Sequence, residues 1–386
     1  MPLIKKINEM GHISLCLDRD INAEGFKYAK SYAVIDIIDK EKCLQYAKEN
    51  KVDGVLTVAT DFPIETVSYI AQEMNLIGIP LQTAKLVKNK YLVKKLLYEN
   101  GIYKSIQFFE ISDENQLSEI TSIIKYPVIV KPCDGSGSKA IEKIENVLNL
   151  KQAVQNAINN SVSKKAFIET FIEGKEFGVE SFVVDGKVHV LGILKKHMTN
   201  PPFYAELGHS IPSGLTEQIE NDIKDNVKRA INVLGITNGS VNMDLIISNN
   251  NEPNIIDIGA RMGGNVIGSH IIPNAKGIDI LENLVNLCIG NKVDLEQRYN
   301  RNVSTRILNF NPGKLISIGN VTDLIDKKNV IDIILNKKPG DMITQYKTNA
   351  DSCGWVVVSD KTIEKTEKLA IKTRKKIEKM LYIQKT

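Results

Sequence analysis

Short apolar runs alternate with amphipathic segments along the first hundred residues of the chain. The runs HISLCLD, YAVID and DGVLTVAT have the composition of buried strands, whereas CLQYAKEN and ETVSYIAQEMN show helical spacing. Strands that alternate with helices predict an α/β domain with a parallel sheet. The chain opens on a helical pattern, PLIKKINEMG, where such domains usually begin with a strand. Either the first strand is missing from this domain, or its sheet is built without one.

The pattern changes from Lys125 onward, where longer β-runs follow one another with few helices. Turn sequences such as Asp185-Gly186 and Asn249-Asn250-Asn251 favour hairpins between antiparallel strands. The runs are YPVIVKP, KAFIETF, GKEFGVESFVVDGKVHVLGILKK and SVNMDLIISNNNEPNIIDIG. A helix near Gly277 to Cys288 leads to a third segment with the strands STRILNF and GWVVVSD and a closing helix. The pattern therefore predicts an α/β domain followed by two α+β bodies.

Composition narrows the class of protein. A chain of 386 residues, 42% of them hydrophobic, is long enough for two or three domains with large cores. No apolar run approaches the roughly 18 residues that cross a bilayer, and the N-terminus lacks the apolar core of a signal peptide. The five cysteines are scattered and never form a CxxC pair, which argues against a disulfide framework or a zinc site. We expect a cytoplasmic protein with no membrane partner.

The positive net charge of +4 is concentrated at the C-terminus. Residues 361–386 hold nine Lys or Arg against three Glu. Their apolar positions predict an amphipathic helix with a solvated lysine face; they are Ile363, Leu369, Ile377, Met380 and Leu381. Up to Met380, no aromatic residue is interleaved with the basic ones, as binding of single-stranded nucleic acid would require. We expect no nucleic-acid partner.

The stretch VIVKPCDGSGSKAI places a lysine, Lys131, before a loop of alternating Gly and Ser. A Walker loop needs Lys-Ser or Lys-Thr directly after its last glycine, and a dinucleotide fingerprint needs a third glycine where Ala140 stands. If this loop binds phosphate, another architecture must hold it.

Two carboxylates lie on apolar strands, Asp244 in VNMDLII and Asp257 in NIIDIGAR, 13 positions apart. Antiparallel pairing across the intervening loop would bring both side chains together. Carboxylates that share a face repel each other unless a divalent cation or a proton intervenes, so Mg²⁺ is the natural ligand. The alternative is a pair of solvent-facing acids on an edge hairpin.

Arg261 follows Asp257 by four residues, and Gly263-Gly264-Asn265 then offers backbone amides on a flexible turn. An always-charged planar donor beside a metal site suits an anion whose charge grows in a transition state. A salt bridge to Asp257 is the competing interpretation.

Glu169 and Glu176 flank FIETFIEGKE, a strand that breaks near Gly174. Such a break exposes main-chain groups that can read a purine edge, and a nearby carboxylate can accept both ribose hydroxyls. A plain turn is the simpler account. Lys90 and Lys131 complete the candidates, although a single lysine on a helix usually faces solvent.

Taken in order, Lys90, Lys131, DGSGS, ETFIEGKE, MD and IDIGAR resemble the ATP-grasp superfamily, with spacings like those of D-alanine:D-alanine ligase-like members. The resemblance covers residues 10–380. It implies the ATP-grasp fold with three domains. A parallel-sheet pre-ATP-grasp domain covers 1–85, and an antiparallel-sheet ATP-binding domain covers 86–295, with a lid subdomain at about 125–195. A small C-terminal α+β domain covers 296–386.

The resemblance also implies roles for these residues. Lys90 and Lys131 would contact the α- and β-phosphates of ATP. Asp134, Gly135, Ser136, Gly137 and Ser138 would fold over the β- and γ-phosphates as a lid that is poorly ordered without nucleotide. Glu169, Phe171 and Ile172 would line the adenine pocket, and Glu176 would hold the ribose. Asp244 and Asp257 would bind Mg²⁺, or alternatively Mn²⁺, and Arg261 would be catalytic through stabilising phosphoryl transfer and the acyl phosphate.

Two positions depart from the superfamily pattern. Asp257 stands where Glu is usual, and Gly259 stands where Asn is usual, which favours one bound metal over two. The segment HMTNPPFYAELGHSIPSGL resembles that of amino-acid ligases, so Glu206 and His209 are expected to face the substrate with the Gly263–Asn265 turn. The alternative for His209 is packing against a neighbouring proline.

The implied activity is an ATP- and Mg²⁺-dependent ligation of a small-molecule carboxylate, such as that of an amino acid, to an amine. Charge neutralisation and in-line positioning would carry the reaction, without a covalent nucleophile. The alternatives are an enzyme that forms carboxyphosphate, as carbamoyl phosphate synthases do, and a regulatory protein that binds ATP without turnover. A homodimer is common among similar proteins.

Overall fold

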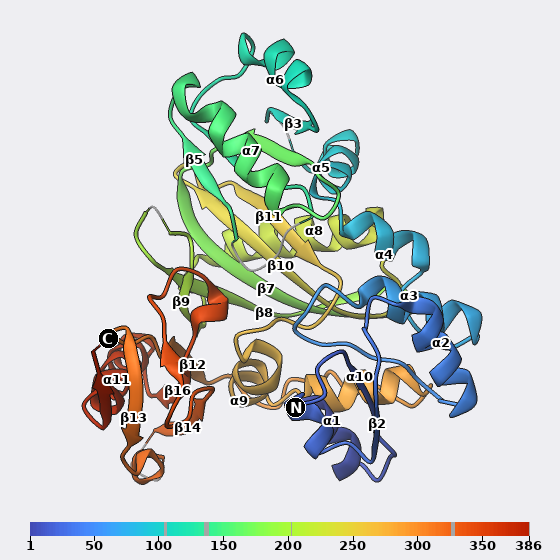
Figure 1. Ribbon diagram of the computed structural model, residues 1–386, viewed down its shortest axis with the longest axis vertical. Coiled ribbons are helices and arrows are strands. Elements are labelled where there is room, and N and C mark those ends of the chain that lie inside the picture. The colour runs from blue at the N-terminus through green and yellow to red at the C-terminus, as the bar shows by residue number, and fades with distance from the viewer. Residues whose placement is uncertain (104–105, 135–138, 202, 326–328, 386) are drawn as a thin grey trace.

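The computed structural model describes residues 1–386 except 104–105, 135–138, 202, 326–328 and 386. Its centre is an eight-stranded antiparallel sheet with the strand order β11-β10-β7-β8-β9-β12-β16-β14. Figure 1 shows this sheet below a separate upper lobe, with the N-terminal part on one side and the C-terminal part on the other. The predicted ATP-grasp architecture of mixed helices and antiparallel sheets is confirmed.

The N-terminal part contains a two-stranded parallel sheet, as the alternating pattern predicts. Its elements are α1 (Pro2–Glu9), β1 (Leu15–Asp18), β2 (Ser31–Val34), α2 (Lys40–Glu49), α3 (Ile64–Glu73) and α4 (Leu81–Val87). The predicted strand in DGVLTVAT is wrong, because residues 53–60 form no regular strand. Ala59 lies at φ +61° and donates its N–H to the carbonyl of Met262, at 3.1 Å. This segment therefore turns toward the central sheet and does not extend the parallel pair.

The upper lobe is a four-stranded antiparallel sheet with the order β3-β6-β4-β5. It comprises β3 (Phe108–Ile111), α6 (Glu114–Thr121), β4 (Val128–Pro132), β5 (Glu142–Ile144), α7 (Leu150–Asn160) and β6 (Ala166–Thr170), and α5 (Lys90–Glu99) leads into it. Buried Ile111, Leu150 and Ile168 join the sheet to its helices in one core. The domain boundaries predicted from the sequence, including those of the lid subdomain at about 125–195, remain predictions.

The central sheet is formed by two long hairpins and the strands that follow them. Its strands are β7 (Gly174–Val184), β8 (Lys187–Met198), β9 (Glu206–Ile211), β10 (Gly239–Ser248), β11 (Pro253–Gly259), β12 (Asn302–Ile307), β14 (Val330–Leu335) and β16 (Gly354–Asp360). The β7–β8 and β10–β11 connections turn at Asp185-Gly186 and at Asn249–Asn251, so both predicted hairpins are confirmed. Helix α8 (Glu217–Val233) packs into one core of this sheet, and α9 (Ile272–Lys276) and α10 (Ile280–Cys288) pack into another.

The C-terminal part adds a three-stranded sheet, β13 (Gly313–Ile318), β15 (Met342–Ile343) and β17 (Leu381–Gln384), and helix α11 (Ile363–Glu378). The predicted closing helix is confirmed, but its expected extent is wrong. It ends at Glu378, and Leu381 begins a strand that pairs with β13. The chain also contains the short helices η1 (Glu24–Lys27), η2 (Val147–Asn149), η3 (Ile267–Ile271), η4 (Val321–Leu324) and η5 (Asn349–Asp351). Among the residues that the structure describes, no helix combines the length and apolar character needed to cross a bilayer.

Candidate active site

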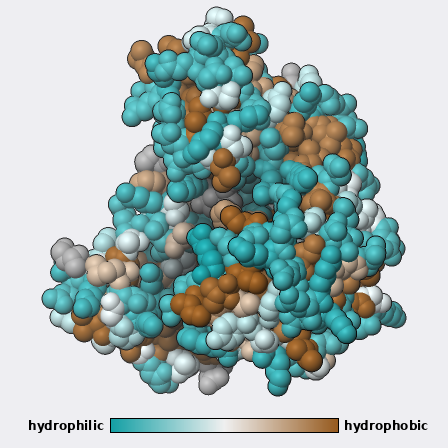
Figure 2. Space-filling view, turned by 45° about the vertical axis from the view of Figure 1, so that its right-hand side comes forward, coloured by the Kyte–Doolittle hydropathy of each residue, from teal (hydrophilic) through white to brown (hydrophobic). Residues whose placement is uncertain are grey.

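A cavity of about 560 Å³ lies between the upper lobe and the central sheet. Figure 2 shows the surface hollowed below the lobe. The predicted residues that line the cavity are Lys90, Lys131, Glu169, Phe171, Ile172, Glu176, Glu206, Asp244, Asp257, Arg261, Gly264 and Asn265. They come from α5, the lobe and the central sheet, so segments that are far apart in the sequence converge on one site. Asp134, His209 and Gly263 are not among the described residues that line it.

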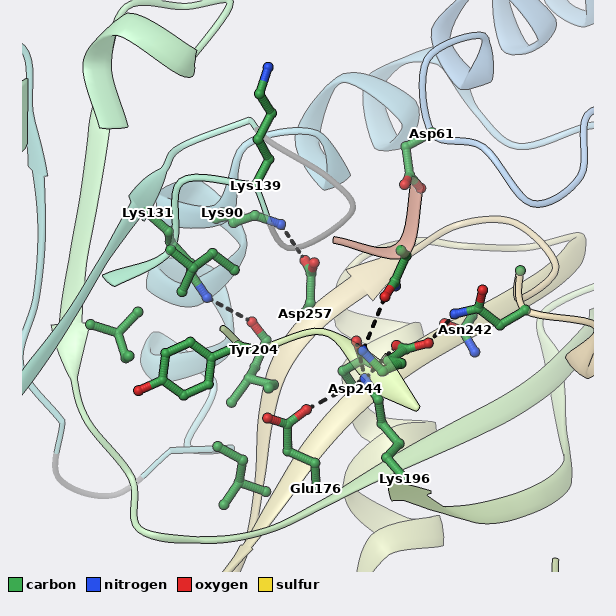
Figure 3. A pocket seen from close by; sticks show the side chains of 18 of the residues that line it. Asp61, Lys90, Lys131, Lys139, Glu176, Lys196, Tyr204, Asn242, Asp244 and Asp257 are labelled. Atoms are coloured by element: carbon green, nitrogen blue, oxygen red, sulfur yellow. Dashed lines mark hydrogen bonds and ion pairs between the residues drawn. The ribbon is translucent and has the colours of Figure 1, made fainter. Parts of the chain in front are cut away.

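The β10–β11 hairpin places Asp244 and Asp257 directly opposite each other, as the sequence predicts. A register shift follows Asp244, and both side chains face the cavity (Figure 3), where they are 29% and 43% exposed. Mg²⁺ is commonly held by one or two carboxylates together with substrate phosphates. No group of three or more His, Cys, Asp or Glu residues within the described chain could hold a metal on its own. The oxygen donors of this pair fit a Mg²⁺ ion that nucleotide phosphates help to bind.

A buried lysine that the sequence analysis missed, Lys196 of β8, lies among three of the cavity carboxylates (Figure 3). Its Nζ is 2.8 Å from Glu206, 3.0 Å from Asp244 and 3.5 Å from Glu176. Burial opposes the charge of Lys196, but the three acids outweigh it and raise the pKa of the lysine. The signal in the sequence was the pair Lys195-Lys196 on an apolar strand, where only one of two successive side chains can face inward.

Lys90 reaches Asp257 from the first turn of α5, with Nζ 2.6 Å from Oδ1. Burial alone would raise the pKa of Asp257, but the charges of Lys90 and Lys131 lower it below its ordinary value. Asp257 is therefore an anion that already has a cationic neighbour, whereas burial raises the pKa of Asp244.

Glu169 is bound by two lysines of the buried interior. Its carboxylate is 2.6 Å from Nζ of Lys131 and 2.9 Å from Nζ of Lys94, and it is 5% exposed. Burial favours the protonated acid, but the two lysines outweigh it and lower the pKa of Glu169 to about 2. Lys94, which the sequence analysis missed, also donates to the carbonyl of Ile255, at 3.1 Å. Glu169 thus fixes Lys131 at the cavity wall.

Arg261 is paired with Asp61, and not with Asp257 as the competing interpretation had it. Its Nε lies 2.9 Å from Oδ1 of Asp61, and its NH2 group donates to Oδ2, at 3.0 Å. Asp61 directly follows residues 53–60, for which the sequence predicts a strand, and nothing in the sequence marks it as a site residue. A Cβ atom at Gly259 would lie 2.9 Å from Cζ of Arg261. The arginine therefore occupies the space that a side chain at position 259 would need.

Glu206 and Asn265, two predicted substrate residues, lie together at the cavity. The amide nitrogen of Asn265 donates to Oε2 of Glu206. His209 lies behind them, with Nε2 3.7 Å from the same oxygen, and it is 1% exposed. Burial lowers the pKa of His209 to about 4. The structure thus supports a packing role for His209 and a cavity position for Glu206.

The turn at Gly263 rests on a buried acid that the sequence analysis missed, Glu180. The N–H of Gly263 and the side chain of Asn242 both donate to Glu180, at 3.1 and 3.0 Å. Burial raises the pKa of Glu180 to about 8. A Cβ atom at position 263 would lie 2.7 Å from this carboxyl, so the close approach requires glycine.

Several apolar or aromatic side chains also line the cavity, as a base-binding pocket requires. They include Ile129, Phe171, Ile172 and Tyr204. The loop that the sequence predicts as a lid begins at Asp134, whose carboxylate accepts hydrogen bonds from the N–H groups of Val162 and Ser163. Residues 135–138 lie outside the described part of the chain, so the predicted lid remains a prediction.

Comparisons with known proteins agree with this geometry. Residues 124–269 match the ATP-grasp domain family, and residues 306–379 match the L-amino acid ligase C-terminal domain 2 family. The chain is 26% identical to the D-alanine–D-alanine ligase of Parabacteroides distasonis, over 53% of this chain and 66% of that protein. It is 25% identical to the alanine–anticapsin ligase of Bacillus subtilis, over 66% of this chain and 58% of that protein.

The chain spans less than two thirds of the length of these curated relatives. Its fold is shared with the crystal structure of an L-amino acid ligase from Bacillus licheniformis, with a TM-score of 0.86 and 22% identity over 100% of this chain and 96% of that one. The chain therefore contains an ATP-grasp domain at residues 124–269, followed by a domain of the L-amino acid ligase C-terminal type at residues 306–379.

Proposed function

We propose that the protein is an ATP- and Mg²⁺-dependent carboxylate–amine ligase that acts on amino acids and releases ADP and phosphate. The observation that carries the proposal is one cavity in which lysines suited to phosphates, paired acids suited to Mg²⁺ and the Glu206–Asn265 pair lie together. The match of residues 306–379 to an L-amino acid ligase domain supports an amino acid as the substrate.

The proposed role of each cavity residue follows from its charge. Lys90 and Lys131 are placed to neutralise phosphate oxygens, while Asp244 and Asp257 would hold Mg²⁺ against them. The bound metal would supply charge neutralisation for phosphoryl transfer. Glu206 is an anion beside the cavity, since Lys196 lowers its pKa despite burial, and it is suited to the ammonium group of an amino acid.

In the proposed reaction, an oxygen of the substrate carboxylate bonds to the γ-phosphorus of ATP as the bond to ADP breaks. The amine then bonds to the acyl carbon, phosphate leaves, and the nitrogen loses a proton. Arg261 is placed to stabilise the negative charge that develops on the transferred group. Positioning and charge neutralisation would carry both steps, as is usual for phosphoryl transfer.

The test is release of ADP and phosphate from ATP and Mg²⁺ in the presence of amino acids supplied singly and in pairs. Release that requires an amino acid supports the proposal. Release that requires bicarbonate and no amino acid would favour carboxyphosphate formation. AMP and pyrophosphate as products would contradict both, and binding of ATP without any release would favour a regulatory protein.

A further inference from the structure

The C-terminal part of the chain holds the main chain of Glu206 from both sides. The hydroxyl of Tyr346 donates to the carbonyl of Glu206, and the N–H of Glu206 donates to Oδ1 of Asn349, at 3.1 Å. Both partners lie about 140 residues further along the chain, on the segment between β15 and β16. Glu206 is the first residue of β9 and lies opposite Met198 of β8. One short segment therefore holds the main chain of Glu206, while Lys196 and Asn265 contact its carboxylate.

This segment is itself held in one conformation. The carboxylate of Asp351 accepts the N–H groups of Lys347 and Thr348, at 3.1 and 2.9 Å, and the hydroxyl of Thr344, at 3.1 Å. These bonds close a capping box at the start of η5. Burial raises the pKa of Tyr346, so its hydroxyl stays protonated and able to donate. The segment is thus a preformed support.

Asn349 also lines the cavity, together with Trp355 of β16. Its Oδ1 accepts the N–H of Glu206, and this hydrogen bond orients the amide. The C-terminal part therefore contributes part of the cavity wall as well as support for Glu206. The nucleotide-facing wall, by contrast, comes from the lobe and the central sheet.

We propose that Tyr346 and Asn349 are positioning residues that hold Glu206 in place for the ammonium group of an amino acid. The C-terminal domain thereby completes the amino-acid site, whereas binding of ATP does not depend on these two residues. This inference rests on the proposed function for the nature of the ligand. The C-terminal domain should therefore affect the affinity for the amino acid and not the affinity for the nucleotide.

The experiment measures binding, which separates this inference from turnover. Titration calorimetry of the full chain gives the Kd of a non-hydrolysable ATP analogue with Mg²⁺, and then the Kd of each standard amino acid in its presence. Asn349→Ala removes the acceptor for the Glu206 N–H, and Tyr346→Phe removes the donor to its carbonyl. Because one hydrogen bond contributes about 1 kcal/mol, each change should raise the amino-acid Kd roughly threefold to tenfold. The Kd of the analogue should not change.

Two further variants complete the design. Asn349→Asp keeps an acceptor oxygen and should retain more amino-acid affinity than Asn349→Ala. Gln345→Ala, at an exposed position of the same segment, is the matched control and should behave as the wild type. Unfolding temperatures show whether each variant is folded.

The outcomes separate cleanly. An unchanged amino-acid Kd in Tyr346→Phe and Asn349→Ala, an equal loss of nucleotide affinity, or a wild-type protein that binds no amino acid would overturn the inference. Amino-acid binding that weakens in these variants without any ADP release by the wild type would support it while contradicting the proposed ligase activity.

Discussion

Two clusters of buried charge face the cavity, and their compositions are opposite. In the first, one acid, Glu169, lies between Lys131 and Lys94. In the second, one cation, Lys196, lies among Glu176, Glu206 and Asp244. With all groups ionised, the first cluster carries an excess positive charge and the second an excess negative charge. The first cluster therefore suits phosphates, and the second suits cations.

The two clusters also differ in how completely their charges are paired. Glu169 is 5% exposed and bound by both lysines, so its cluster is a fixed part of the wall. Asp244 is 29% exposed at its side chain, and burial raises its pKa. An acid whose charge is incompletely compensated gains most from a new cation. The first cluster is thus a fixed part of the cavity wall, and the second is the cluster that we propose to bind an added cation.

The largest expected effect comes from breaking the first cluster with Lys131→Ala. The change removes a charge that we propose to bind phosphate, and it leaves Glu169 buried with one partner fewer. We expect the affinity for ATP to fall by roughly tenfold to a hundredfold, because a hydrogen bond to a charged group contributes about 1.5–3 kcal/mol. Titration of the nucleotide analogue measures this. Lys165→Ala is the matched control, because Lys165 pairs with Glu110 at the same 2.6 Å but does not line the cavity.

The second cluster is tested by Asp244→Asn. This change removes one of the two carboxylates that are placed to hold Mg²⁺. The Mg²⁺ concentration for half-maximal ADP release should rise roughly tenfold or more, and metal-free binding of the nucleotide should change little. If the Mg²⁺ dependence stays as in the wild type, Asp244 is not a metal ligand.

Sequence reasoning found the parts of the site that local pairing determines. Asp244 and Asp257 could be placed together because one hairpin connects them, and its turn residues are visible in the sequence. Asp61 and Arg261 are 200 positions apart and meet only because an irregular segment reaches the central sheet. Lys196 was equally hidden, since its meaning depends on three acids from three different strands. Contacts between distant segments leave no periodic signal to read.

A smaller effect is expected from Lys196→Met, which leaves three acids without their shared cation. Repulsion among them should lower the unfolding temperature in EDTA, and Mg²⁺ should restore it by more than it shifts the wild type. Thermal unfolding with EDTA and with MgCl₂ measures both. Lys195→Met is the matched control, since the neighbouring lysine pairs with Glu367 at 3.2 Å and does not line the cavity. An equal Mg²⁺ shift in all three proteins would contradict the idea that the second cluster needs a cation.

The smallest expected effect is a difference between the two clusters in how the free energy of unfolding depends on pH. His209, beside Glu206, has a folded-state pKa of about 4, below the value of about 6.5 in an unfolded chain. Its neutral form is compatible with folding above pH 6.5, and stability is lost as the pH falls from about 6.5 toward 4, because the unfolded chain takes up the proton first. Glu169, with a pKa of about 2, stays charged throughout this range. The free energy of unfolding from urea titrations should therefore fall less steeply with acid in His209→Gln than in the wild type. Parallel curves for the two proteins would show that His209 does not titrate in this window, and that acid sensitivity arises elsewhere.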